Sequence, residues 1–309
     1  MPDHVRVSVV MTTYNHEKYI QESIESVLLQ KQENLELIVI DDGSSDRTHE
    51  IASKYDNSNV HVLKKPNGGP GDAFNFGAKN ARGDIIVLFS GDDVMTPYSI
   101  QMRVDALRAG TAGAVCSIPR WIDGNGSVIP WDRHPNSFKR FSGLKPAALF
   151  SRLYFEGNFV CAPSVAMYAN VWRTVGMFNK SLWQLQDYEY WMRLSAQGIS
   201  LICLDEPCVS YRWHGENLSN ETQASRSEFE HLAIWISAPR LLGREMLLSV
   251  VFGEAFSDYP VDLTDEDLLS LVYCRHHNSG IRQYGKRKLF FESDFSDVVE
   301  RVKKSVAIL

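Results

Sequence analysis

The sequence contains no long hydrophobic run, whereas a membrane-spanning helix needs about 18 or more apolar residues in succession. The first residues, 1–6, contain no apolar stretch of the signal-peptide type. The five cysteines are odd in number and include no Cys-x-x-Cys pair, which argues against a zinc ribbon and against a full set of disulfides. We therefore expect a cytoplasmic chain with reduced thiols.

Basic residues are fewer than acidic ones. The chain has 32 Lys and Arg against 38 Asp and Glu, a formal net charge of −6. A protein built chiefly to bind nucleic acid phosphates carries a basic excess, so we expect no nucleic acid partner. Apolar residues make up 44% and charged residues 23% of the 309 positions, which is typical of a globular protein that buries a core without disulfides or metal.

Two common phosphate-binding motifs are missing. Gly68, Gly69 and Gly71 form a glycine cluster, but no Lys-Ser/Thr follows it as in a P-loop. No G-x-G-x-x-G opens a helix after the first expected strand, as in dinucleotide-binding domains. These absences argue against P-loop kinases and against dehydrogenases.

From residue 5 to about 120, short β-branched segments alternate with segments of helical period, which is typical of βαβ units with a parallel sheet. We expect strands at residues 5–11, 35–40, 60–63, 85–89 and 114–118. Helices are expected at 20–28, 47–55, 72–81 and 98–108. After residue 120 we expect a loop or hairpin over 131–146, a helix over 187–196 and strands at 201–204 and 209–213. From residue 224 onward the chain is mainly helical in pattern, with a helix start at Thr264.

Polar residues follow four of the expected strands. They are the segments 12–15 (TTYN), 41–46 (DDGSSD), 67–69 (NGG) and 90–93 (SGDD). Ligands of open α/β sheets bind outside the carboxyl ends of the strands, so we expect these segments to share one edge. That edge collects carboxylates, amides and hydroxyls.

Six segments between residues 5 and 220, taken in order, carry a further signal: SVVMTTYNHEKYI, LIVIDDGSSDRT, NGGPGDAFNFGAKNARGD, SGDD, QDYEYWMRL and YRWHGENLS. Together they resemble the family 2 glycosyltransferases of the GT-A fold, which are inverting enzymes. The resemblance implies an α/β, Rossmann-like, mostly parallel sheet flanked by helices in a catalytic domain over 1–220. Residues 1–119 would bind the nucleotide sugar and 120–220 the acceptor, followed by a helical C-terminal region, 221–309, that resembles no family.

An acidic pair, Asp92 and Asp93, ends the fourth expected strand. Mg²⁺ is usually held by one or two carboxylates plus substrate phosphates. The resemblance implies Mg²⁺ or Mn²⁺ on Asp93 and the donor ribose on Asp92. Many relatives have a further Asp where this chain has Ser90, which leaves the division of roles open. The alternative is that one carboxylate caps the following helix.

The resemblance also places the nucleotide. Asp41 or Asp42 would accept a hydrogen bond from the donor base, and Tyr14 would offer a stacking face. The imide N–H of uracil or thymine suits a carboxylate, and we expect a UDP-sugar in preference to a thymidine or guanosine one. Asp-Gly-Ser-Ser-Asp is equally ordinary turn chemistry, which is the alternative. The implied nucleotide-sugar-binding residues are Thr12, Thr13, Tyr14, Asn15, Asp41, Asp42, Asn75 and Asp92.

Asp187 is the implied catalytic base. It lies in the first turn of an expected helix, on the face of Tyr190 and Trp191, so it points toward packed structure. A carboxylate that is ionised yet partly desolvated can take a proton from an acceptor hydroxyl. Relatives often have Glu-Asp here, whereas this chain has Gln186-Asp187, and we assign Gln186 to the acceptor. The alternative is a charge that only stabilises the helix.

His214 follows the strand at 209–213 and would complete the metal site or contact the leaving diphosphate; a histidine with neither role is the alternative. Aromatic residues between 121 and 159 suggest acceptor recognition, because aromatic faces pack against sugar rings. The acceptor residues we expect are Trp121, Trp131, Asn158 and Gln186.

The implied reaction moves a sugar from a nucleotide-diphosphate sugar to a saccharide or lipid-linked saccharide in surface glycan synthesis. The rivals are a nucleotidyltransferase, which should carry a basic Gly-rich loop after the first strand, and a non-catalytic nucleotide-sugar-binding protein. Basic clusters at 286–288 and 301–304 suggest peripheral contact at the inner face of an anionic membrane. Bracing of the catalytic domain and a homodimer contact are the alternatives, because acidic residues interleave with the basic ones.

Overall fold

The computed structural model describes residues 5–110, 112–130, 138–142, 144–215, 217–218, 224–253 and 263–292. Within them, a large sheet has seven strands in the order β3 (Val60–Lys64), β2 (Leu35–Asp41), β1 (Val7–Thr13), β4 (Ile85–Ser90), β8 (Ala166–Tyr168), β6 (Ala114–Ser117) and β9 (Leu201–Leu204). All of the predicted strands of the first 120 residues are present, with ends that shift by a residue or two.

The large sheet is mostly parallel, as predicted. β1 lies between β2 and β4 and runs parallel to both, and only β8 runs antiparallel to its neighbours, β4 and β6. In this register Thr13 is level with Asp41, and Thr12 is level with Ser90. The polar segments that follow these strands therefore leave the sheet at the same edge.

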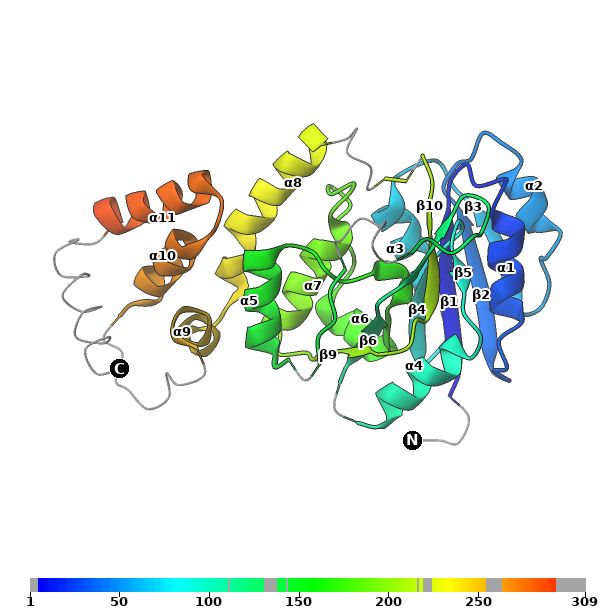
Figure 1. Cartoon of the computed structure of the whole chain (residues 1–309), viewed down its shortest axis with the longest axis horizontal. Helices are drawn as coiled ribbons and strands as arrows, with labels where there is room; N and C mark the ends of the chain where they lie inside the picture. Colours follow the sequence, from blue (N-terminus) through cyan, green and yellow to red (C-terminus); the bar gives the residue numbers. More distant parts are fainter. Residues whose placement is uncertain are drawn as a thin grey trace.

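Alternate side chains of β1 enter two different cores, because successive residues of a strand point to opposite faces. Val7, Val9 and Met11 pack against α1 (Ile20–Leu28), α2 (Thr48–Ser53) and α4 (Ser99–Arg108). Val10 faces the other core, which contains α3 (Pro70–Asn80), α5 (Pro146–Glu156), α6 (Ala169–Val175) and α7 (Gln186–Ala196). Figure 1 shows α1 and α2 on one side of the strands and α5 and α7 on the other.

A second sheet of three strands joins distant parts of the chain. Its strands, in order, are β5 (Val94–Met95), β10 (Val209–Trp213) and β7 (Arg120–Asp123). β10 is antiparallel to β5 and parallel to β7. β5 begins directly after Asp93, near the end of β4. Its pairing with β10 therefore places the segment that follows β10 beside the end of β4.

The C-terminal region is helical where the structure describes it, as predicted. It contains α8 (Ala224–Ser237), α9 (Arg244–Phe252), α10 (Asp265–Arg275) and α11 (Ser279–Glu292). Thr264 caps α10, since its hydroxyl accepts from the Asp267 N–H and the Asp267 carboxylate accepts from the Thr264 N–H. Residues 138–142 and 144–145 have no regular structure, and 131–137 of the predicted loop lie outside the described residues.

The C-terminal helices share the core of α5 and α7. Trp235 of α8, Leu247 of α9 and Tyr273 of α10 belong to the same buried apolar cluster as Tyr154 and Trp191. In Figure 1, α8 lies beside α5 and α7, whereas α10 and α11 lie at the end of the molecule remote from α1 and α2. None of the helices that the structure describes has both the length and the apolar character needed to cross a bilayer. Two short 3-10 helices, Ala162–Ser164 and Ala238–Leu241, complete the described elements.

Candidate active site

Asp42 holds the glycine turn that follows β3. Its carboxylate is buried and accepts hydrogen bonds from the backbone N–H groups of Gly68 (3.0 Å, Oδ1) and Gly69 (2.8 Å, Oδ2). The Nζ of Lys65 lies 2.6 Å from Oδ1. Charge-assisted bonds of this kind are short and strong, so Asp42 fixes the start of α3 against the sheet edge. Contact of Asp42 with a donor base stays a prediction.

The loops after β1 and β2 are bound to each other. Asp41 accepts from the Ser44 N–H (2.8 Å), and the Asn15 side chain accepts from the Ser45 N–H (2.9 Å). Asn15 adopts a left-handed backbone conformation (φ 55°), which asparagine tolerates better than most residues. Tyr14 is 46% exposed at this edge.

Three side chains that can ligate a metal meet beside these loops. His214 Nε2 lies 3.1 Å from Asp92 Oδ2, and His16 Nε2 lies 3.8 Å from the same oxygen. One ligand atom from each of the three residues lies within 4.8 Å of the others. We call His16, Asp92 and His214 the His–Asp–His cluster. One carboxylate and two imidazoles form a donor set that fits a divalent transition-metal ion.

The pKa values of the two aspartates after β4 are shifted in opposite directions. Burial alone would raise the pKa of Asp92, but His16, the hydrogen bond from His214 and that from Ser90 outweigh it and hold the pKa well below its usual range. Burial and the adjacent Asp92 raise the pKa of Asp93 well above its usual range. Asp93 accepts the Arg212 N–H (2.8 Å, Oδ1) and lies outside the His–Asp–His cluster. Its role as a metal ligand stays a prediction.

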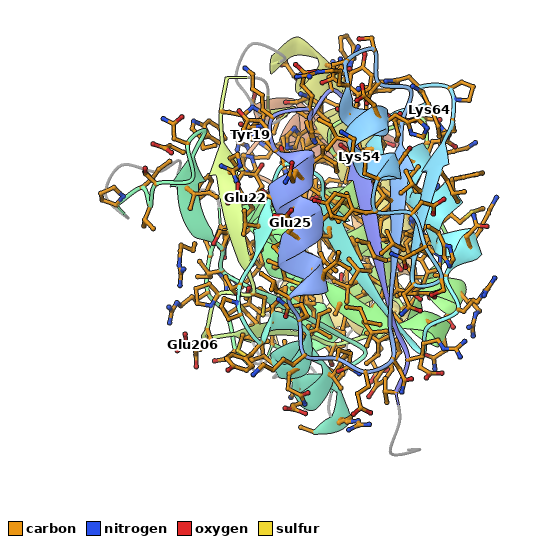
Figure 2. The ribbon with its side chains drawn as sticks, turned by 90° about the vertical axis from the view of Figure 1, so that its right-hand side faces the viewer. Tyr19, Glu22, Glu25, Lys54, Lys64 and Glu206 are labelled. Atoms are coloured by element: carbon orange, nitrogen blue, oxygen red, sulfur yellow. The ribbon has the colours of Figure 1, made fainter. Side chains whose placement is uncertain are left out.

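Arg212 of β10 connects this site to α1. Its Nε donates to the Asp92 carbonyl oxygen (2.7 Å), and its Nη2 donates to Glu22 (2.6 Å, Oε2). Its guanidinium also lies over the Tyr19 ring, 4.9 Å from the ring centroid. Figure 2 shows Tyr19 and Glu22 at the upper end of α1. Arg212 therefore fixes the backbone of Asp92, which is a structural role.

Asp187 lies in the first turn of α7, as predicted. Its Oδ2 accepts from Asn158 Nδ2 (3.0 Å), and its Oδ1 accepts from the Tyr188 N–H (2.7 Å). Burial raises the pKa of Asp187 to about 6, although both hydrogen bonds lower it. Asn158, which we predicted to contact the acceptor, is a hydrogen-bond partner of Asp187; a direct contact with the acceptor stays a prediction.

The start of α7 lies against the glycine turn that Asp42 holds. A Cβ atom at Gly69 would lie 3.0 Å from the Trp183 ring, and one at Gly71 would lie 3.3 Å from Gln186 Cγ. On the other side, burial raises the pKa of the Cys161 thiol, and the carboxylates of Asp93 and Asp187 raise it further. The turn that Asp42 holds thus contacts the start of α7, and Asp93 and Asp187 both act on the Cys161 thiol.

Other predicted site residues have structural contacts. Both polar groups of the Asn75 side chain bond to the Phe178 backbone (2.9 Å each), which ties α3 to the segment before α7. The Trp121 side chain is 3% exposed and packs against Phe138 and Tyr211, so little of its ring is accessible to a sugar. Nucleotide and acceptor roles for these two residues stay predictions. Trp131 lies outside the described residues, whereas Gln186 is half-buried beside Gly71.

His16 is the cluster member that the sequence did not reveal. Its signal is weak, since a single histidine lies three residues after β1 in a segment already assigned to the nucleotide. Only the arrangement of β1, β4 and β10 places its ring near Asp92.

The model of the family described as Glycosyl transferase family 2 matches residues 8–172, which is more than half of the chain. The chain belongs to glycosyl transferase family 2. The match ends before Asp187 and His214, so both of these side chains lie outside it.

Relatives of this family 2 member include uncharacterized glycosyltransferases of Rickettsia. That of R. conorii is 29% identical over 252 residues, which are 80% of this chain and 40% of the relative. That of R. typhi is 28% identical over 79% of this chain and 74% of the relative. A chondroitin synthase of Pasteurella multocida is 28% identical over 69% of this chain and 21% of its own length. The chain thus spans less than half of the R. conorii and P. multocida proteins.

Solved structures share the fold. TarS (1–349) of S. aureus in complex with UDP-GlcNAc has a TM-score of 0.59 at 19% identity, over 89% of this chain and 74% of that one. The mannosyltransferase PcManGT of Pyrobaculum calidifontis, in complex with GDP-Man and Mn²⁺, has a TM-score of 0.56 at 16% identity, over 97% and 84%. The predicted GT-A fold is confirmed.

Proposed function

We propose that this family 2 glycosyltransferase moves a sugar from a nucleotide-diphosphate sugar to a hydroxyl group of a saccharide acceptor, with inversion at the anomeric carbon. The observation that carries the proposal is the environment of Asp187. Its carboxylate is half-buried and accepts hydrogen bonds from Asn158 and from the Tyr188 N–H, and burial raises its pKa to about 6. It lies at the start of α7, where Trp183 and Gln186 contact the glycine turn at the sheet edge. A general base works best when its pKa is close to the operating pH.

In the proposed reaction, Asp187 accepts the proton of the acceptor hydroxyl as that oxygen attacks the anomeric carbon. The bond from this carbon to the diphosphate oxygen breaks on the opposite face, so the anomeric configuration inverts and the nucleotide diphosphate leaves. Asn158 keeps Asp187 in place through its bond to Oδ2. The exposed ring of Tyr14 offers a stacking face for the donor base.

Asp92, His16 and His214 would hold a divalent ion, and their donor set favours Mn²⁺ over Mg²⁺ because Mg²⁺ prefers oxygen ligands. Such an ion, when bound, neutralises the negative charge that develops on the leaving diphosphate. We include Asp93 as the second carboxylate of the site. The Mn²⁺ in the complex of PcManGT supports a divalent ion here.

We further propose a UDP-sugar as the donor, and a saccharide or lipid-linked saccharide of a surface polysaccharide as the acceptor. TarS, which shares the fold, has been solved in complex with UDP and with UDP-GlcNAc. Two relatives from Pasteurella multocida are named chondroitin synthase and hyaluronan synthase. Both names describe polymers of sugars, which supports a growing saccharide as the acceptor class.

A panel of nucleotides tests the donor class. The purified chain is melted alone and with UDP, GDP or dTDP, each in Mn²⁺, Mg²⁺ or EDTA. A ligand that binds only the folded state raises the melting temperature, so we expect UDP with Mn²⁺ to raise it by a few degrees and EDTA to remove the effect. UDP release from UDP-sugars, with and without saccharide acceptors, then measures turnover. A stronger response to GDP would correct the base, and no response to any nucleotide would contradict the function.

The pH dependence of turnover reports on Asp187. A protonated carboxyl cannot accept the acceptor proton, so we expect kcat/KM to fall about tenfold per pH unit below a pKa near 6. The Asn158 bond lowers this pKa, so Asn158→Ala should move the acid limb of the profile to higher pH. Asn80, whose side chain is exposed and bonds within its own helix, supplies the control substitution Asn80→Ala. An acid limb that stays in place in Asn158→Ala would assign the titration to another group.

A further inference from the structure

A carboxylate from α8 binds the segment that leads into α7. The Glu230 side chain accepts the backbone N–H groups of Trp183 (2.7 Å, Oε1), Gln184 (2.9 Å, Oε2) and Leu185 (2.8 Å, Oε2). Glu230 is only 7% exposed. Three consecutive donors therefore converge on one buried charge, and α7 begins at the next residue, Gln186.

Glu230 binds the N-cap residue of α7 and the two residues before it. The first N–H groups of a helix have no partners within it, and a negative charge near them is favourable because that end of the helix is positive. Leu185 is the N-cap residue of α7 and has no side chain that can accept a hydrogen bond. Glu230 accepts the N–H groups of residues 183–185 from a different helix, 45 residues beyond Leu185 along the chain.

A second contact joins α8 to α7 at Tyr188, the residue that follows Asp187. Trp235 Nε1 donates to the Tyr188 hydroxyl (3.3 Å), and that hydroxyl donates to the Leu153 carbonyl oxygen (2.7 Å). The residue two positions before Asp187 and the residue directly after it are thus both held by α8. The direction of the Asp187 side chain depends on this short stretch of backbone.

The segment that Glu230 holds, residues 183–185, also contacts the glycine turn after β3. The Trp183 ring lies against Gly69, whose N–H is bound by Asp42. The guanidinium of Arg226 in α8 also lies over this ring, 5.5 Å from the centroid. Displacement of residues 183–185 would therefore move the base relative to the glycine turn.

We propose that Glu230 is a positioning residue of the transfer reaction, which holds residues 183–185 and thereby fixes Asp187 for proton transfer. The proposal rests on the role of Asp187 in the proposed function. It assigns the helical C-terminal region a part in catalysis: α8 orients the base.

Substitution of Glu230 by Gln tests the proposal with little change in volume. The two oxygens of Glu230 accept three N–H groups, whereas glutamine has one acceptor oxygen and an NH₂ group that would face a backbone donor. Glu230→Asp keeps both oxygens and the charge on a shorter side chain. Glu228, exposed on the same helix, supplies the matched control Glu228→Gln.

The full-length chain and these variants are compared for amide hydrogen exchange of residues 183–188, for the UDP-induced rise in melting temperature, and for kcat and KM with a UDP-sugar. In Glu230→Gln we expect faster exchange in this segment and a kcat lower by about 100-fold, the loss that a small misplacement of a reacting group causes. We expect an unchanged donor KM and an unchanged UDP-induced shift. Glu230→Asp should recover part of the lost kcat, and Glu228→Gln should match the wild type.

Three outcomes would overturn the proposal: wild-type kcat in Glu230→Gln, unchanged exchange at 183–188, or a fall in kcat that only parallels a loss of UDP binding. A wild-type chain that releases no UDP from any UDP-sugar would instead contradict the proposed function. Amide exchange would still show in that case whether Glu230 holds residues 183–185, so the two failures are distinguishable.

Discussion

Substitution of Asp187 by Asn is expected to lower kcat by about 10² to 10⁴-fold, the usual contribution of a general base. The change removes the negative charge and the proton-accepting oxygen, while the side chain keeps its shape. Nucleotide binding should persist. The residues proposed to bind the uracil base of the donor and the metal ion belong to the loops after β1, β2, β4 and β10. Steady-state UDP release in the presence of acceptor measures kcat, and the UDP-induced shift in melting temperature measures binding.

Glu189 supplies the control for this substitution. It lies in the first turn of the same helix, but its carboxylate pairs with Arg193 (2.6 Å). Glu189→Gln therefore removes one charge from α7 without touching Asp187, and we expect kcat to stay near the wild-type value. Wild-type turnover in Asp187→Asn would exclude Asp187 as the base. A similar loss in both variants would point to the charge of the helix start instead.

The second large effect is expected for Asp92→Asn. The Asp92 carboxylate is buried between His16 and His214, and its lowered pKa keeps it ionised at neutral pH. Asparagine offers a neutral oxygen in place of this charge, so we expect Mn²⁺ affinity to fall sharply. Turnover should fall by about 100-fold or more, because metal stabilisation of developing charge is worth several kcal/mol. Calorimetric titration of the EDTA-treated chain with Mn²⁺ measures the affinity directly.

Two further variants locate the ligand. Asp105 is exposed on α4 and bonds to Gln101, so Asp105→Asn should bind Mn²⁺ as the wild type does. Asp93→Asn tests whether the ligand is Asp93, as the sequence predicts, or Asp92, as the geometry of the His–Asp–His cluster indicates. If Mn²⁺ affinity is lost in Asp93→Asn and retained in Asp92→Asn, then the sequence identified the ligand and the cluster did not.

Local patterns predicted much of the fold. The β-branched runs located the parallel strands of the first 120 residues, and β9 and β10 begin and end where expected. Patterns failed where an element is short or depends on its partners. β5 has two residues and β8 has three, too few for a recognisable alternation. Two helices, α5 and α6, were also missed in the region where the pattern loses regularity.

The same limit applies to the site. The sequence placed Asp42, Asp92 and Asp187 at the ends of predicted elements, because the strand ends and the first turn of α7 are visible as patterns. It did not reveal Glu230, whose partners lie 45 to 47 residues away. His16 was missed for the same reason, since its contact with Asp92 joins two different strand ends. Pairings between distant residues follow from topology, which composition and periodicity do not encode.

The position of β10 sets a lower limit on the length of a working fragment. β10 lies between β5 and β7, and it brings His214 to the end of β4. A fragment that stops at Trp172, where the family match ends, would keep β5 and β7 but remove the strand that joins them, together with α7. Shortened versions made for crystallisation or for screening of inhibitors therefore have to extend beyond β10, and through α8 if they are to keep Glu230.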